Sequence, residues 1–254
     1  GGLNYYNRRT REFKWYRPQE GRNSISHNNV KALYYDADKE IIWIGTHLGG
    51  LNKLDIRSGH FTHYRMEGNN PQSLPSDIIR DITPYKDLLI IATQNGVCLF
   101  NPANGQCRQL FKDSKEGKSI KMVADVVFDS EGTLWIAATG EGVFSYRFDT
   151  RKLTNYRHDA ANPNSLSNNN VNNITQDSKG NLWFSTSGSG LDLYRPETND
   201  FENFDKGKNG LASDCIYETQ ESPTSGKLLL ITNEGFSIFD YRNKDFNNYS
   251  AENG

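Results

Sequence analysis

The sequence predicts an all-β protein built from repeated four-stranded antiparallel units. A glycine followed by an apolar residue recurs every 45 to 48 residues along the 254-residue chain. Within each period, short apolar runs alternate with turn residues, as they do in chains of successive β-hairpins. No segment carries an apolar stripe at helical spacing over three turns. A steady period of this size, filled by four strands, is typical of the blades of a β-propeller.

The fullest repeat lies in residues 162–194 and opens with an Asn-rich polar loop. Residues 171–176 are expected to be extended, and a turn ending in Gly180 stops them because glycine supplies the positive φ of a tight hairpin. Residues 182–184 (Leu-Trp-Phe) form a second strand rich in side chains that pack on a pleated surface. Residues 191–194 form a third strand. Residues 200–204 alternate apolar and polar, as a half-buried fourth strand does.

The same landmarks occur throughout the chain. The glycine that opens the third strand stands at Gly2, Gly50, Gly96, Gly142, Gly190 and Gly235. First strands are predicted to begin at Val30, Ile79, Val123, Val171 and Ile216. Second strands are nearly all apolar, which indicates that both of their faces are covered. They also contain small residues expected where blades converge, namely Gly45, Ala92, Ala137 and Ser185.

One repeat region is predicted to cover residues 1–254. It comprises a half blade at 1–17 and five full blades at about 24–65, 73–111, 119–157, 165–205 and 211–250. The chain begins at the third strand of one blade, so we expect it to be a fragment of a longer protein and part of a seven-bladed ring. A ring closed within these residues would leave an unpaired strand edge.

The composition excludes several classes of function. There are 29 basic and 31 acidic residues and a formal charge of −2, which gives no electrostatic reason to expect binding to nucleic acid or to an anionic membrane. No apolar run is long enough to span a bilayer. Cys98 and Cys107 flank one predicted hairpin and could face each other, but we expect these two and Cys215 to be buried free thiols.

Catalytic motifs are scarce. The chain has no His-Glu-x-x-His, Gly-x-Ser-x-Gly or Cys-x-x-Cys motif and no phosphate-binding glycine loop. Its five histidines are scattered. Asp36, Asp129 and Asp177 stand where turns favour Asp, so we expect them to cap turns rather than transfer protons. No catalytic residue, metal or cofactor is therefore predicted for this region.

Two longer motifs carry a family resemblance. Residues 165–171 (SLSNNNV) precede residues 176–183 (QDSKGNLW), and the first full blade has WIGT at 43–46 and GGLN at 49–52. These runs resemble the two-component regulator propeller repeat. The strands at 89–90 and 228–229 lack the Trp of that pattern, so their blades depart from it.

The resemblance implies a periplasmic sensor in a hybrid two-component protein that controls polysaccharide-utilisation genes. In such proteins the propellers precede a membrane helix, a histidine kinase and a DNA-binding output, none of which is present here. The implied ligand is an oligosaccharide or another small polar molecule. The parent protein is expected to lie in the inner membrane, to be a homodimer and to carry the kinase activity, with no nucleic acid bound by this region.

Topology indicates where such a ligand would bind. In an up-and-down sheet, the turn between the second and third strands and the connection that leaves the fourth strand lie at the same end. Long polar connections on a rigid scaffold commonly carry binding sites. The predicted ligand-binding residues at this end are His47, Arg65, Asn95, Glu141, Arg157, Ser187, Ser189 and Glu234. Trp15, Tyr16, Arg17 and His158 lie where fourth strands end, and such aromatic and polar groups suit sugars. The opposite end is expected to hold only short turns.

Two other functions remain open. A propeller enzyme, such as a polysaccharide lyase or glycoside hydrolase, would spread its paired carboxylates or metal ligands over several blades. A protein-interaction platform would need no chemistry at all. Fold alone does not choose among these functions.

Overall fold

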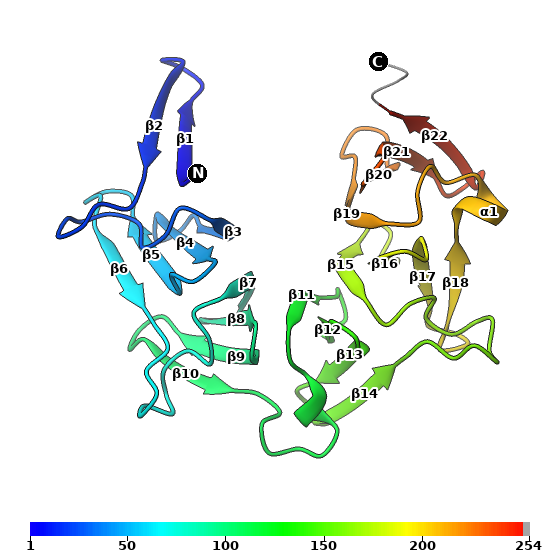
Figure 1. Ribbon diagram of the computed structural model, residues 1–254, viewed down its shortest axis with the longest axis horizontal. Helices are drawn as coiled ribbons and strands as arrows, with labels where there is room; N and C mark the ends of the chain where they lie inside the picture. The colour runs from blue at the N-terminus through cyan, green and yellow to red at the C-terminus, as the bar shows by residue number, and fades with distance from the viewer. Residues whose placement is uncertain (251–254) are drawn as a thin grey trace. The chain divides into compact units, whose positions relative to one another are not determined.

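The computed structural model describes residues 1–250, whose regular secondary structure is almost entirely antiparallel β-sheet (Figure 1). The chain forms two compact units, Gly1–Val123 and a second that begins at Ala124. The first unit contains the two-stranded sheet β1 (Leu3–Asn7) and β2 (Glu12–Tyr16). Its two four-stranded sheets consist of β3 (Val30–Asp36), β4 (Ile41–Thr46), β5 (Leu51–Asp55) and β6 (Phe61–Tyr64), then β7 (Ile79–Tyr85), β8 (Leu88–Thr93), β9 (Gly96–Asn101) and β10 (Gln106–Gln109).

The second unit contains three four-stranded sheets, each in sequence order across the sheet. They consist of β11 (Val123–Phe128), β12 (Leu134–Ala138), β13 (Gly142–Arg147) and β14 (Lys152–Tyr156); β15 (Val171–Gln176), β16 (Leu182–Thr186), β17 (Leu191–Arg195) and β18 (Asp200–Phe204); and β19 (Ile216–Glu221), β20 (Leu228–Thr232), β21 (Gly235–Asp240) and β22 (Asp245–Tyr249). These sheets are propeller blades, which confirms the predicted fold class. The two short helices, η1 (Gly117–Ser119) and α1 (Lys206–Asn209), lie in connections between blades.

The first strands begin at the five residues predicted for them. Each lies at one edge of its sheet. One feature escaped prediction: in four of these strands the pairing register shifts just after the first residue, between Val30 and Ala32, Ile79 and Asp81, Val171 and Asn173, and Ile216 and Glu218. Such bulges bend a strand locally, and they require no particular residue type that the sequence could display.

The recurring glycine before the third strand has a steric cause. At Gly50, Gly142 and Gly190, φ lies between 69° and 82°. A Cβ atom on these residues would lie 2.3, 2.2 and 2.0 Å from a carbonyl oxygen at the end of the fourth strand. Only glycine fits such a position without strain. The period of the sequence is therefore set by close backbone contact within each blade.

Small residues in the second strands make room for the next blade, as predicted. A Cβ on Gly45 would lie 2.6 Å from Ile79 Cγ2, on the first strand of the following sheet. At the equivalent position in the second unit, the Ser185 hydroxyl lies 2.6 Å from the Thr219 hydroxyl. Strands β12 and β16 are buried along their whole length, which explains why their sequences are nearly all apolar.

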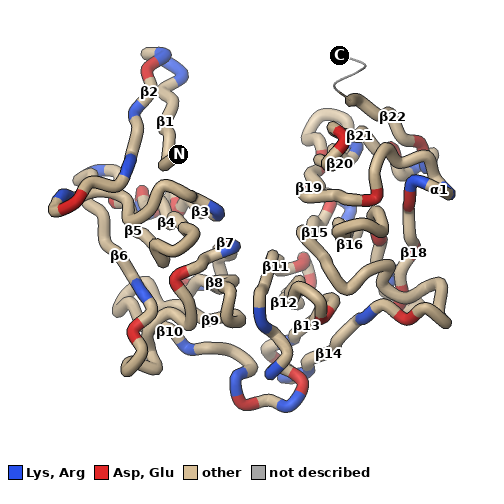
Figure 2. Tube along the Cα trace, in the orientation of Figure 1, with Lys and Arg blue, Asp and Glu red and all other residues tan. Residues whose placement is uncertain are grey.

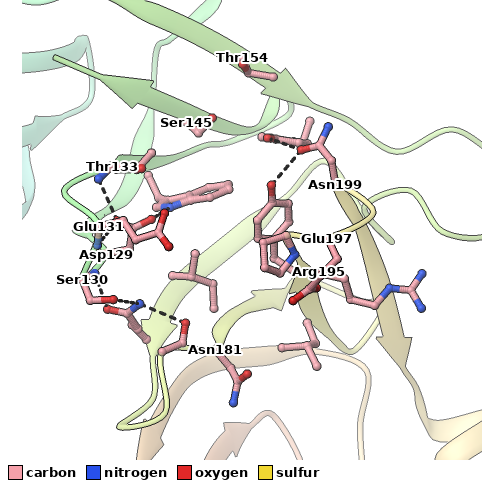
Figure 3. A pocket seen from close by; sticks show the side chains of 18 of the residues that line it. Asp129, Ser130, Glu131, Thr133, Ser145, Thr154, Asn181, Arg195, Glu197 and Asn199 are labelled. Atoms are coloured by element: carbon pink, nitrogen blue, oxygen red, sulfur yellow. Dashed lines mark hydrogen bonds between the residues drawn. The ribbon is translucent and has the colours of Figure 1, made fainter. Parts of the chain in front are cut away.

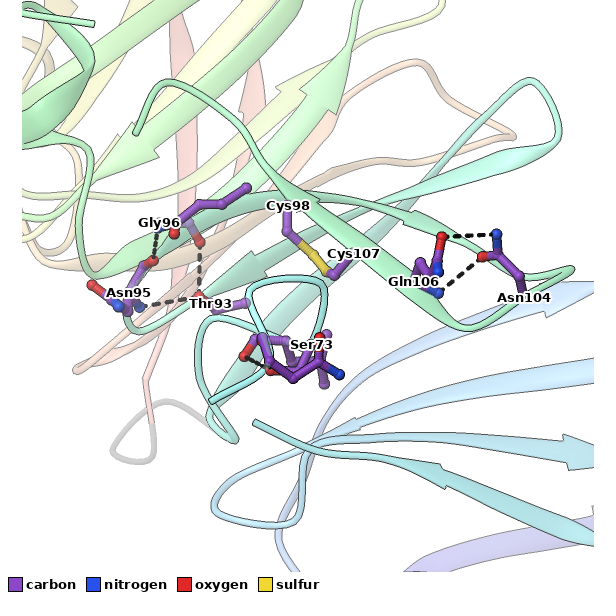
Figure 4. Close-up of a disulfide and its surroundings, with 11 residues drawn as sticks. Ser73, Thr93, Asn95, Gly96, Cys98, Asn104, Gln106 and Cys107 are labelled. Atoms are coloured by element: carbon purple, nitrogen blue, oxygen red, sulfur yellow. Dashed lines mark hydrogen bonds between the residues drawn. A yellow bond between two sulfur atoms is a disulfide. The ribbon is translucent and has the colours of Figure 1, made fainter. Parts of the chain in front are cut away.

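The prediction for two of the cysteines was wrong. Cys98 and Cys107 form a disulfide between β9 and β10 (Figure 4), with their Cα atoms 6.0 Å apart. In this register Cys98 pairs with Gln109 and Cys107 with Phe100, so the two cysteines are diagonal neighbours on one face of the hairpin. That separation is ordinary for a disulfide. Spacing alone could not show it, because the register depends on the turn. Cys215 is a free thiol.

Candidate functional site

All eight predicted residues lie at one end of their sheets, which we call the loop end. There the turn after each second strand bonds to the residue just before a first strand. The backbone N–H of His47 donates to Asn29 O (2.8 Å), that of Gln94 to Ile78 O (3.0 Å) and that of Ser187 to Asn170 O (2.9 Å). The predicted meeting of turns and long connections is thus present within each unit.

In the first unit, the predicted polar side chains fasten the loops. Arg65 donates from Nη1 to Leu48 O (3.0 Å) and forms an ion pair with Asp77 (3.4 Å). Asn95 donates from Nδ2 to Pro75 O (3.3 Å). His47 is half-buried in the turn after β4. A ligand here would meet groups that already have protein partners.

The second unit shows the same arrangement. Arg157 forms an ion pair with Glu141 and donates to Gly140 O (3.2 Å), so it clasps the turn of its own blade. Glu234 pairs with Lys206 at 3.4 Å. Ser187 forms an isolated bridge with Cys215. The geometry brings Glu141 and Arg157 together, and it places Ser189 in a groove.

This groove, which we call the loop-end groove, has a volume of about 360 Å³. Of the predicted ligand-binding residues, Ser189 is the one that lines it. The other lining groups come from the connections after β14 and β18, from β18 itself and from the β16–β17 turn: His158, Asp159, Ala160, Asn162, Pro163, Ser165, Ser167, Gly188, Asn203, Asp205, Lys208 and Asp214. The groove therefore offers hydroxyl, amide, imidazole, ammonium and carboxylate groups within one unit.

A buried carboxylate supports the groove from below. Asp192, on β17, is fully buried and accepts hydrogen bonds from the N–H and hydroxyl of Ser167 (both 2.9 Å) and from Asn203 Nδ2 (2.6 Å). Burial raises the pKa of Asp192 to about 7, and the bonds from Ser167 and Asn203 oppose that rise. Because both partners line the groove, Asp192 orients two groups that a ligand would touch.

Sequence reasoning missed Asp192 although a signal existed. An acidic residue stands here between two leucines, Leu191 and Leu193, in a predicted third strand. The equivalent residue of the first full blade, Asn52, is also buried and accepts from the N–H of Ser26 (2.8 Å). A polar residue at this position in two repeats indicates a shared role in holding the incoming loop.

The expectation for the opposite end was incomplete. Asp129 and Asp177 do cap turns there: Asp129 accepts from the N–H of Thr133 (2.8 Å) and from Trp135 Nε1 (2.8 Å). The same end, however, holds a larger cleft of about 660 Å³ between the β11–β14 and β15–β18 sheets (Figure 3). We call it the inter-blade cleft. Its lining includes Asp129, Glu131, Trp135, Ser145, Arg147, Lys152, Thr154, Tyr156, Tyr194, Arg195, Pro196, Glu197 and Asn199.

The described residues show mixed charges and no metal-binding cluster. Lys, Arg, Asp and Glu are interspersed along both units without a long run of one sign (Figure 2). Within residues 1–250, no group of three or more His, Cys, Asp or Glu residues is arranged to hold a metal ion. Both helices of the described chain are single turns, too short to cross a membrane.

Two stretches of the chain match a known family model. Residues 24–47 and 165–188 match the model of the two-component regulator propeller. The chain carries two-component regulator propeller repeats. Both matches cover a connection, a first strand and a second strand, the segments from which the resemblance was predicted. No curated protein sequence matches the chain.

Solved structures share the fold of these propeller repeats. The extracellular domain assigned to the hybrid two-component system BT3049 of B. thetaiotaomicron superposes with a TM-score of 0.82 at 23% identity, over 98% of this chain and 32% of that one. PorZ, a surface component of the type-IX secretion system of Porphyromonas gingivalis, gives 0.70 at 16% identity, over 94% of this chain and 36% of its own. This chain thus spans about a third of the length of the proteins it resembles.

Proposed function

We propose that this propeller region is the ligand-binding part of a sensor in a hybrid two-component protein and that it binds an oligosaccharide in the loop-end groove. The observation that carries the proposal is the groove itself, a concave polar site at the loop end of the β15–β18 sheet. Support for the sensor role comes from the two-component regulator repeats. In this proposal the region lies in the periplasm and its parent protein is a homodimer in the inner membrane. The kinase, and the output that controls polysaccharide-utilisation genes, lie in other parts of that protein.

The groove suits a sugar because it mixes donors and acceptors at short spacing. His158 donates from Nδ1 to Leu166 O (2.9 Å), which leaves its other ring nitrogen for a ligand hydroxyl. The Ser189 hydroxyl accepts from Asn168 Nδ2 (3.2 Å) and keeps its own hydrogen to donate. Each such bond adds little net affinity, since both groups must leave water first. Selectivity would come from several bonds together.

The carboxylates in the groove accept hydrogen bonds from the backbone, which favours binding over catalysis. Asp205 caps α1 by accepting from the N–H of Lys208 (2.7 Å), and Asp214 accepts from the N–H of Lys206 (2.6 Å). A pair that acts as acid and base in glycoside hydrolysis must be positioned around the scissile bond. These two, and Asp159, which accepts from the N–H of Ala161 (3.0 Å), instead stabilise the backbone of their connections. We therefore propose a site that holds its ligand without converting it.

Isothermal titration calorimetry of the complete ectodomain with a panel of oligosaccharides tests the proposal. Ser189→Tyr would fill the groove and abolish binding, whereas His158→Ala would weaken it about tenfold or less, the equivalent of about 1.4 kcal/mol or less. Circular dichroism would show that both variants keep the sheet structure. Unchanged binding by both variants would contradict the proposed site, and release of shorter products would indicate an enzyme.

A further inference from the structure

The inter-blade cleft stands out because the next blade interface in the same unit is filled. Pro196 directly follows β17 and lines the cleft. At the equivalent place after β21 stands Tyr241, whose ring lies 5.4 Å from that of Trp183. Lys179 Nζ lies over the same tyrosine ring at 5.0 Å. A bulky residue thus occupies one interface where proline leaves the other open.

The side chains that border the two interfaces also differ in chemistry. Tyr156 and Tyr194 border the cleft, and each donates its hydroxyl to Asn199 Oδ1 at 2.8 Å. The residues at the equivalent strand positions of the filled interface are Phe204 and Phe239, both buried. The cleft thus has two hydroxyl groups and an amide where the filled interface has apolar rings. Packing alone does not require these polar groups.

These hydroxyl groups can still bind a ligand. The bonds to Asn199 use the hydrogen of each tyrosine and the amide oxygen, which leaves the tyrosine oxygens as acceptors and Asn199 Nδ2 as a donor. Burial and the adjacent Tyr156 hydroxyl raise the pKa of Tyr194, so its hydroxyl keeps its hydrogen near neutral pH. Figure 3 shows Asn199 on one wall, with Ser145 and Thr154 nearby and Glu131 across the opening.

The charges around the cleft indicate a neutral ligand. Arg195 forms a two-point ion pair with Asp200 (2.7 and 2.8 Å), and Arg147 pairs with Asp149 (3.1 Å). The Asp129 carboxylate is committed to its turn and to Trp135. The other charged residues of the lining, Glu131, Glu197, Lys152 and Lys179, are two acids and two bases, so the cleft has no excess of one sign to attract an anionic or cationic ligand. Half-buried tyrosine rings beside hydroxyl and amide groups suit the C–H faces and hydroxyls of a neutral sugar.

We propose that the inter-blade cleft is a second binding site, separate from the loop-end groove, that holds a short segment of a neutral oligosaccharide between the β11–β14 and β15–β18 blades. Its volume of about 660 Å³ falls in the range of small-molecule sites, roughly 300–1,000 Å³. Tyr156 and Asn199 come from different blades, so an occupied cleft would tie the two blades together. This site needs nothing from the loop-end groove.

The test copies the filled interface into the open one. Calorimetric titration of the whole chain uses four neutral probes (cellohexaose, maltohexaose, xylohexaose and mannohexaose) and one anionic probe, hexagalacturonate. Pro196→Tyr should abolish binding of at least one neutral probe. The double variant Tyr156→Phe, Tyr194→Phe keeps both rings and should weaken the same probe three- to tenfold or more. Tyr241→Phe, the matched change at the filled interface, should leave binding unchanged.

The outcomes separate the two sites. Ser189→Tyr in the loop-end groove should not alter binding that Pro196→Tyr abolishes. The inference is overturned if no neutral probe binds in a manner sensitive to Pro196→Tyr, or if the double variant binds as tightly as the unmodified chain. Stronger binding of hexagalacturonate than of every neutral probe at this site would also overturn it. Thermal melting shows whether Pro196→Tyr is folded, and the double variant decides the matter if it is not.

Discussion

The two blade interfaces of the second unit share a scaffold but differ in what fills it. In both, a tryptophan on the second strand donates to the turn aspartate: Trp135 Nε1 to Asp129 (2.8 Å) and Trp183 Nε1 to Asp177 (3.0 Å). Both also have a serine after that aspartate bonded to the next blade. The serine N–H donates to a side chain at the end of the following first strand, Ser130 to Gln176 (2.8 Å) and Ser178 to Glu221 (2.7 Å).

The two interfaces differ in the residues that surround the tryptophan. At the Trp183 interface, Phe204, Phe239 and Tyr241 pack around the indole with ring centroids 5.4 to 6.1 Å away. At the Trp135 interface, tyrosine and proline take these places and a cleft remains. Repeats joined by nearest-neighbour contacts tolerate such variation, because each interface contributes its own stability. A propeller can thus have one blade interface filled by side chains and the next open to a ligand.

Removing the two tryptophans should show the largest contrast. Trp183 is fully buried, and Trp183→Ala should lower the free energy of unfolding by about 3–5 kcal/mol. Trp135→Ala should cost less, because Trp135 borders the cleft, although it too is buried and has three rings with centroids 5.0 to 5.6 Å away. Urea denaturation followed by circular dichroism measures both. Equal losses would mean that the cleft does not loosen its interface.

Acid titration tests the blade that both interfaces share. Its buried Asp192 has a folded-state pKa of about 7, above the ordinary value of 3.8. The folded state therefore keeps a proton that the unfolded state loses, and stability should fall by up to about 4 kcal/mol as the pH rises from about 4 to about 7. In Asp192→Asn this slope should vanish, so the variant matches the parent chain near pH 4 and exceeds it at pH 8. Parallel stability curves from pH 4 to 8 would contradict the assignment.

Emptying the filled interface is expected to have a smaller effect. Tyr241→Ala removes a ring that packs on Trp183, and we expect a loss of about 2 kcal/mol, less than for a phenylalanine in a core. The variant should also open a cleft beside Trp183, seen as faster quenching of tryptophan fluorescence by acrylamide. Pro196→Ala, on the rim of the open cleft, is the matched control and should change quenching little. Similar quenching in the two variants would remove the contrast.

Removing two tyrosine hydroxyl groups should change the free energy of unfolding in opposite directions, and these are the smallest effects that we expect. The Tyr241 hydroxyl is buried without a hydrogen-bond partner among the described residues, whereas that of Tyr194 donates to Asn199 (2.8 Å). Tyr241→Phe should therefore stabilise the chain by about 1 kcal/mol, and Tyr194→Phe should destabilise it by about 1 kcal/mol. Thermal melting resolves shifts of this size. Destabilisation by Tyr241→Phe would show that this hydroxyl has a partner.

Much of the architecture could be predicted from the chain alone. The first strands begin at the expected residues, and the glycine of each repeat lies where a Cβ would meet a carbonyl oxygen. Turn aspartates such as Asp129 were correctly expected to cap turns. These features depend on a few neighbouring residues, through backbone conformation and local hydrogen bonds. For the candidate site, Ser189 of the eight expected residues lines the loop-end groove and several others fasten their own loops; their part in ligand binding stays a prediction.

What the sequence by itself determined is the blade: its period, its strand order and the burial of both faces of its second strand. The tertiary structure decided the Cys98–Cys107 disulfide, the burial of Asp192 and the difference between the two interfaces of the second unit. The reason is the distance along the sequence between the residues that interact. A turn or a glycine contact is set within one hairpin, but the cleft depends on how side chains from two repeats fill a common space. Pro196 and Tyr241 look like ordinary loop residues until the tryptophan of the preceding blade is placed beside them.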